Sequence, residues 1–133
     1  MTPVDPFDLP DWLGVADVTW TALAGLRTGS LVAGQLGAEG QDPVPCDLLA
    51  ADDAYPAPVA PDDVRLAVHQ AWRHGEVYLL ERDERVVLGV PGTAFSADLV
   101  LDAVGRLAKA VGASAERYSV RLRIGDVGRS GPR

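Results

Sequence analysis

Residues 61–90, PDDVRLAVHQAWRHGEVYLLERDERVVLGV, establish the fold class because they predict a helix followed by a β-hairpin. Pro61 suits the first helical position, and the two aspartates after it meet the positive end of the helix dipole. Apolar residues then recur at helical spacing until Gly75, a typical helix end. The apolar runs 77–80 and 86–90 flank a charged turn and predict the two strands of the hairpin.

Downstream of this stretch, the sequence predicts a second helix and a strand. Ser96 is a typical N-cap residue, apolar residues follow it at helical spacing, and Gly112 ends the helix. Over residues 117–124 apolar and polar side chains alternate, which predicts a strand with one face on the core. The polar face of this strand carries three arginines: Arg117, Arg121 and Arg123.

Upstream, three shorter stretches predict strands. Residues 18–24 alternate apolar and polar side chains, and residues 30–36 can return as the second strand of a hairpin. Residues 44–51 predict a third strand, in which Pro45 suits an edge or the strand start. The whole order indicates an α+β domain: an antiparallel sheet of about five to six strands with two helices packed mainly on one face.

The chain of 133 residues predicts one domain over residues 15–124. Residues 1–14 mix prolines, acids and aromatic side chains and predict an extended arm. We expect Phe7 and Trp12 to pack on the same chain, where each contributes about 1.5–3 kcal/mol if buried. The alternative is that the arm docks in a partner's groove. Residues 125–133 predict a disordered tail.

Charge is distributed unevenly along the chain. Residues 1–63 contain eleven acids and one base, whereas residues 64–133 contain eleven bases and eight acids, within a net charge of −7. This balance disfavours a nucleic-acid partner, and its asymmetry can steer a basic partner or the basic end of another copy. The alternative is that the acids only keep the loops solvated.

The sequence predicts a soluble cytoplasmic protein without a membrane segment. Its first residues carry neither the basic start nor the apolar run of an export signal. Its longest apolar runs are far shorter than the roughly 20 residues of a membrane helix. Cys46 is the single cysteine and cannot form an internal disulfide, which suits a reducing compartment.

No catalytic, cofactor-binding or metal-binding motif is recognisable. His69 and His74 lie on one predicted helix but point about 140° away from each other, so they cannot share a metal ion. The glycines form no phosphate-binding loop, and the apolar neighbours of Cys46 favour a place in the core. We therefore expect no catalytic residue, no cofactor and no metal.

Four segments carry a resemblance to known proteins: DPFDLPDWLG at 5–14, CDLLA at 46–50, HQAWRHG at 69–75 and VRLRIG at 120–125. Together they resemble a group of small actinobacterial proteins of unknown function, over most of the chain apart from the tail. The resemblance implies no activity and no site residues.

These observations favour a non-enzymatic protein-binding or regulatory module. Its expected interaction surface is Phe7, Trp12, Arg117, Arg121 and Arg123. The alternative is a small-ligand-binding protein or enzyme with a site at a subunit interface, around Asp47, His69 and Trp72. We also expect a homodimer through an exposed strand edge or an apolar sheet face, because Trp20 and the run 86–90 offer more hydrophobic surface than two short helices need to cover.

Overall fold

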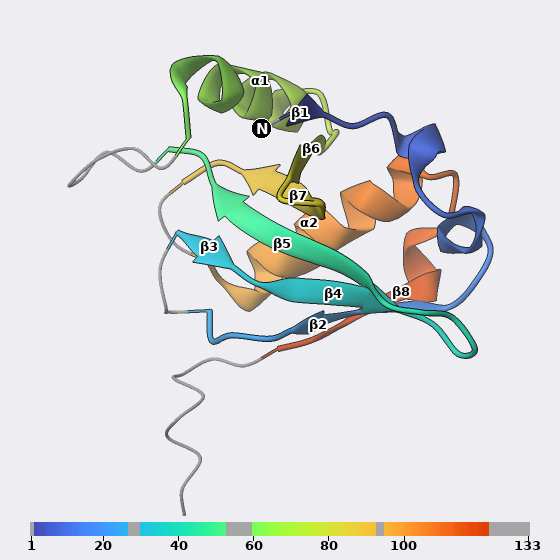
Figure 1. Cartoon of the computed structure of the whole chain (residues 1–133). Helices are drawn as coiled ribbons and strands as arrows, with labels where there is room; N and C mark the ends of the chain where they lie inside the picture. The colour runs from blue at the N-terminus through green and yellow to red at the C-terminus, as the bar shows by residue number, and fades with distance from the viewer. Residues whose placement is uncertain (1, 27–29, 53–59, 93–94, 123–133) are drawn as a thin grey trace, which may run out of the picture.

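The described residues form a curved sheet and two helices (Figure 1). The computed structural model describes residues 2–26, 30–52, 60–92 and 95–122. Its strands are β1 (Thr2–Pro3), β2 (Val18–Ala22), β3 (Leu31–Val32), β4 (Gly34–Gly37), β5 (Val44–Ala50), β6 (Tyr78–Arg82), β7 (Arg85–Val90) and β8 (Tyr118–Arg121). Its helices are α1 (Asp62–Arg73) and α2 (Ala97–Ala110), with short 3-10 turns η1 (Pro6–Asp8), η2 (Asp11–Gly14) and η3 (Ala115–Arg117).

The strands follow the order β1-β6-β7-β5-β4-β2-β8, and β3 pairs with β5 beside this path. The α+β class is therefore confirmed, but the described part of the sheet has eight strands and is mixed, so the prediction of five to six antiparallel strands was wrong. The β5–β7 and β2–β8 pairs are parallel. The first arises because the second strand of the hairpin lies beside β5. The second arises because α2 carries the chain back along the sheet before β8.

The two helices lie on opposite faces of the central strands, so the prediction of one covered face was also wrong. Neighbouring residues on β5, β6 and β7 divide between the faces, as alternating strand side chains must. The face packed with Val64 and Val68 of α1 holds Leu49, Leu80 and Val87. The face packed with Val100 and Val104 of α2 holds Leu48, Leu79 and Leu88. Strands that are apolar on both faces need cover on both.

Both helices begin and end where local chemistry predicts. The hydroxyl of Ser96 accepts a hydrogen bond of 3.1 Å from the backbone N–H of Leu99, which caps α2. Gly75 and Gly112 follow the two helices with φ of +80° and +84°, a left-handed conformation that glycine adopts without strain. No helix among the described residues is long and apolar enough to cross a membrane.

The N-terminal arm docks on its own chain, but Phe7 does not take part. Leu13 is fully buried and Trp12 is partly buried against the same core. Phe7 is 88% exposed, so the prediction that it packs on the chain was wrong. The physical reason is that the arm forms the turns η1 and η2 instead of running extended, and η1 has no buried residue. The predicted tail, residues 125–133, lies outside the described residues.

Candidate functional site

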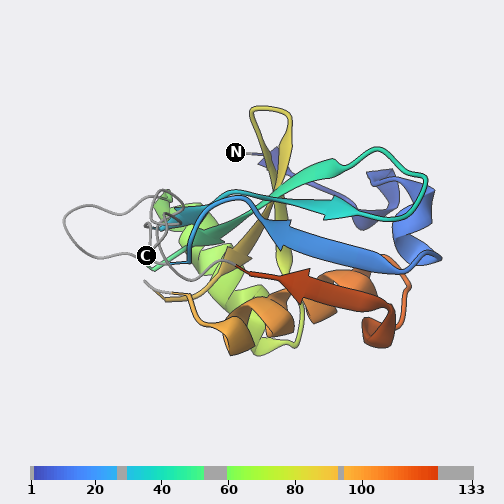
Figure 2. The same ribbon diagram turned by 90° about the horizontal axis from the view of Figure 1, so that it is seen from below.

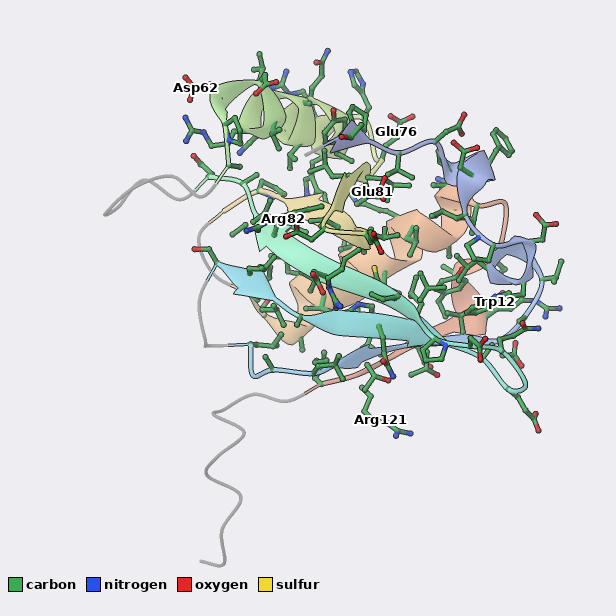
Figure 3. The ribbon with its side chains drawn as sticks, in the orientation of Figure 1. Trp12, Asp62, Glu76, Glu81, Arg82 and Arg121 are labelled. Carbon is green, nitrogen blue, oxygen red and sulfur yellow. The ribbon has the colours of Figure 1, made fainter. Side chains whose placement is uncertain are left out.

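β8 lies at one end of the described strand order and carries Arg121, one of the three arginines of the predicted surface. It pairs with β2 on one side, and within the described ranges no strand pairs with its other side. Tyr118 and Val120 pack on the core, whereas Ser119 and Arg121 lie on the opposite, exposed face. Figure 3 shows Arg121 pointing away from the sheet and from both helices. Arg121 is therefore presented beside an open strand edge.

The three predicted arginines do not form one continuous surface. Arg117 belongs to η3 and donates to the backbone carbonyl of Val15 at 3.0 Å, with Asp17 at 3.7 Å. The guanidinium of Arg121 forms no hydrogen bond or ion pair with any of the described residues. Arg123 lies outside the described residues. Of the predicted cluster, Arg121 is thus the member whose charge faces solvent without a described partner.

The opposite edge of the sheet is closed. Thr2 and Pro3 pair with β6 as the two-residue strand β1, and the backbone N–H of Val4 then donates to the carbonyl of Leu79 at 3.0 Å. A short edge strand with proline blocks further pairing, because proline has no N–H to donate. The fold thus protects the β6 edge and leaves the described β8 edge without such cover.

A shallow hollow of about 280 Å³ extends from Arg121 across the exposed face of β2 and β4. Its lining is polar and includes two carboxylates: Asp17, Thr19, Thr21, Gln35, Gly37, Ala38, Glu39 and Arg121. The hydroxyls of Thr19 and Ser119 lie 3.0 Å apart across the β2–β8 pair. None of the described residues that line this hollow is aromatic, so they lack the stacking surface that single-stranded nucleic acids need.

A second hollow of about 490 Å³ lies next to Pro6, the residue before the exposed Phe7. It is lined by Pro6, His74, Gly75, Glu76, Val77, Arg106, Lys109 and Ala110. The C-terminal ends of α1 and α2 meet there. Because the C-terminal end of a helix carries negative partial charge, this position disfavours an anionic ligand despite its basic side chains.

Arg106 fastens α2 to the turn after α1. Its Nη1 donates to the backbone carbonyls of Trp72 at 2.9 Å and Glu76 at 3.0 Å, and its Nε donates to Asp102 at 3.0 Å. The guanidinium also lies 3.6 Å from the centroid of the Trp72 ring, a cation–π contact. These contacts occupy Arg106, so its role in this hollow is structural.

The three residues of the alternative site, Asp47, His69 and Trp72, each have a different partner within this chain. Trp72 stacks on Arg106, and His69 Nε2 lies 3.8 Å from Asp52 Oδ2. No hydrogen bond or ion pair among the described residues joins the three side chains, and the alternative site at a subunit interface stays a prediction.

Asp47 instead forms a buried ion pair that sequence reasoning missed. Its carboxylate accepts hydrogen bonds from Arg85 Nε at 2.8 Å and Nη2 at 2.7 Å, and from the backbone N–H of Gly34 at 3.1 Å. The hydrogen bonds that Arg85 donates to the Asp47 carboxylate raise the pKa of Arg85. An acidic residue inside an apolar strand was the available signal that a partner exists. Nothing in the sequence indicated which of eleven arginines it is.

Cys46 is a core residue, as predicted. It is fully buried, and burial raises the pKa of its thiol. Its backbone carbonyl accepts a hydrogen bond of 2.8 Å from the indole N–H of Trp20. A buried neutral thiol is a poor nucleophile, since the thiolate is the reactive form.

The described residues include no group of three or more histidine, cysteine, aspartate or glutamate side chains placed to hold a metal ion. The resemblance to small actinobacterial proteins stays a prediction. No protein-family model, no curated protein and no solved structure matches this chain.

Proposed function

We propose that this protein is a non-enzymatic, cytoplasmic protein-binding or regulatory module, and that its partner binds at the edge of β8. The observation that carries the proposal is that the two edges of the described sheet differ in whether a further strand covers them. β1 closes the β6 edge, whereas no described strand covers β8. A strand edge offers a row of backbone donors and acceptors, which an extended segment of another protein can pair with.

The exposed Phe7 supports the same proposal. The neighbouring Leu13 is fully buried, so the arm is attached to the body while one aromatic ring is held in solvent. Exposed aromatic side chains on a fixed scaffold are typical anchors of protein interfaces. Phe7 and the β8 edge are thus two surfaces that a protein partner can use.

A homodimer through β8 is the competing proposal, and two observations weigh against it. Trp20 is fully buried and Val87, Leu88 and Val90 are at most 1% exposed, so the expected surplus of apolar surface is absent from these residues. Two antiparallel copies of β8 would also bring the two Arg121 side chains close together. Like charges on facing strands are destabilising.

A small-ligand site in the hollow next to Pro6 is the second candidate function. Its volume of about 490 Å³ falls in the usual range for ligand pockets, which is the observation that favours it. Its weakness is that the donors of Arg106 are occupied by this chain's own carbonyls and Asp102. A bound metabolite in native mass spectrometry, lost in a His74→Ala variant, would favour this candidate.

Site-specific photo-crosslinking in cells tests the proposed function. A benzophenone amino acid replaces Ser119 on β8, and the matched control carries it at Leu66, which is 71% exposed on α1. We expect a discrete adduct with another protein from position 119 and none from position 66. An adduct of two copies of the 14.0 kDa chain would overturn the proposal and support a homodimer instead. Equal crosslinking at both positions, or none, would refute it.

A further inference from the structure

We infer that the edge of β8 accepts an extended segment with acidic side chains at alternate positions and apolar side chains between them. The inference rests on the proposed function and names the chemistry of the partner. It follows from the two different surfaces that flank β8 and from the backbone edge between them. Figure 2 shows β8 at the border of the sheet, with β2 on one side and α2 running beside it.

The backbone edge provides the first part of the site. Every second residue of a strand turns both its N–H and its C=O to the same side, so about half of the four residues of β8 direct these groups away from β2. An added strand would lie about 4.7–4.9 Å from β8 and pair with them. This pairing supplies affinity without regard to side chains.

Arg121 selects the side chains on the exposed face. A residue of the added strand directly opposite Arg121 would have its Cβ about 4.5–5.5 Å away, within reach of an ion pair for glutamate or aspartate. Asp17, a carboxylate in the lining of the hollow beside Arg121, already lies 3.7 Å from Arg117. Glu39 follows β4, which is two strands away from β8, or about 10 Å. An acidic side chain on the added strand would thus give Arg121 a counter-charge in addition to these two carboxylates.

The other face of the added strand would lie toward α2, where the side chains are apolar. A Cβ added at Gly105 would lie 3.8 Å from the Cβ of Ala115, so this flank of α2 faces η3, immediately before β8. Leu101 is one turn earlier on the same flank and is 49% exposed. Val120 and Leu122 on the β8 side are only partly buried. Apolar side chains on the added strand would cover these three residues.

Together these surfaces select an alternating segment and disfavour a second copy of β8. A second copy would present its own Arg121 to this face, whereas an acidic partner would neutralise the charge. Opposite charge at a single exposed arginine contributes modest affinity, so backbone pairing and apolar contact must supply the rest.

Binding of synthetic peptides to the full chain tests the inference. The probe is a fluorescently labelled hexapeptide of alternating glutamate and valine, followed by fluorescence anisotropy at low and physiological salt. We expect Arg121→Gln to weaken binding about three- to fivefold, as for a single exposed ion pair. Arg73→Gln, which removes an exposed arginine on α1, should leave it unchanged. Arg121→Glu should bind the alternating lysine–valine peptide better than the glutamate–valine peptide.

Backbone pairing is tested separately from charge. Hydrogen exchange should show new protection of the amides of residues 118–122 when the peptide binds. Two further peptides carry N-methyl groups, one on its odd-numbered amides and the other on its even-numbered amides. Only one of the two should lose binding, because only one set of N–H groups is directed at β8. Peptide binding without protection of these amides would overturn the inference, as would binding that Arg121→Glu leaves unchanged.

The two proposals fail in different ways. A cellular adduct from position 119 with no binding of the alternating peptide would overturn the chemistry inferred for the partner and leave the proposed function in place. Absence of any specific adduct would refute the proposed function itself. Unchanged melting temperatures of the Arg121 variants serve as the folding control, and Arg121→Lys, which keeps the charge, should retain most of the binding.

Discussion

Replacing Gly34 with alanine should destabilise the protein, because the new methyl group would collide with the indole of Trp20. Gly34 lies on β4 opposite Ala22 of β2, next to the fully buried Trp20. A Cβ at this position would lie 2.5 Å from Trp20 Cε2 and 2.8 Å from Nε1. Non-bonded carbon atoms pack at about 3.5–4.0 Å, so the indole must move by about 1 Å.

The indole has little freedom to make that movement. Its N–H donates to the carbonyl of Cys46 at 2.8 Å, and the ring is enclosed by the core that α2 covers. Overpacking of a core costs about 1–3 kcal/mol, and weakening a buried hydrogen bond adds about 1 kcal/mol. We expect Gly34→Ala to lower the free energy of unfolding by about 3 kcal/mol. For a chain of this length that corresponds to a fall in Tm of about 10 °C.

Urea denaturation followed by circular dichroism measures the loss, and the same strand offers a matched control. Gly37 has no atom within 4 Å of an added Cβ, so Gly37→Ala should change the free energy of unfolding by less than about 0.5 kcal/mol. In a Trp20→Phe background the smaller ring should relieve most of the cost of Gly34→Ala. Equal stability of the Gly34→Ala and Gly37→Ala variants would refute the reasoning.

Three further predictions concern the ion pair, the buried tyrosine and the arm. Asp47→Asn should lower the free energy of unfolding by about 2–3 kcal/mol, less than for a fully buried pair because the Arg85 side chain is 34% exposed. Urea titrations measure the loss, with Asp52→Asn at an exposed position as the control. Equal stability of the two variants would contradict this prediction. Burial raises the pKa of Tyr118 to about 12, so the free energy of unfolding should be fully retained below about pH 10 and fall as pH rises toward 12. The Tyr118→Phe variant should show a smaller fall. A pH profile identical to that of the unmodified protein would contradict the assignment. Leu13→Ala should cost about 2–5 kcal/mol in thermal unfolding, whereas Phe7→Ala, at 88% exposure, should leave Tm almost unchanged; a large loss from Phe7→Ala would show that the ring is buried.

The elements with local signals were predicted well. The helix bounds depend on caps and on apolar spacing within one segment, and Ser96 and Gly75 act as the sequence indicates. The hairpin was predicted from its apolar flanks, although its turn residues are unusual. Asp83 and Glu84 adopt φ of 54° and 63° without glycine, a conformation that favours glycine or asparagine. The pairing of two adjacent apolar strands outweighs this local cost.

The candidate site could be predicted only in part. Arg121 was identified from the alternation of its strand, because that pattern separates a core face from an exposed face within a few residues. The pattern could not show that Arg117 would turn to Val15 and Asp17, about a hundred residues earlier in the chain. Nor could it show that β8 lies at one end of the described strand order and β1 at the other.

Composition and periodicity therefore identify the α+β class, the two helices and most strands, since each of these depends on residues close together in the chain. The strand order, the mixed pairing and the placement of the helices on opposite faces depend on contacts between distant segments. The same holds for the Asp47–Arg85 pair, separated by 38 residues. Many pairings bury similar apolar area and leave the local patterns unchanged, so the choice among them is made by side-chain packing in the assembled fold.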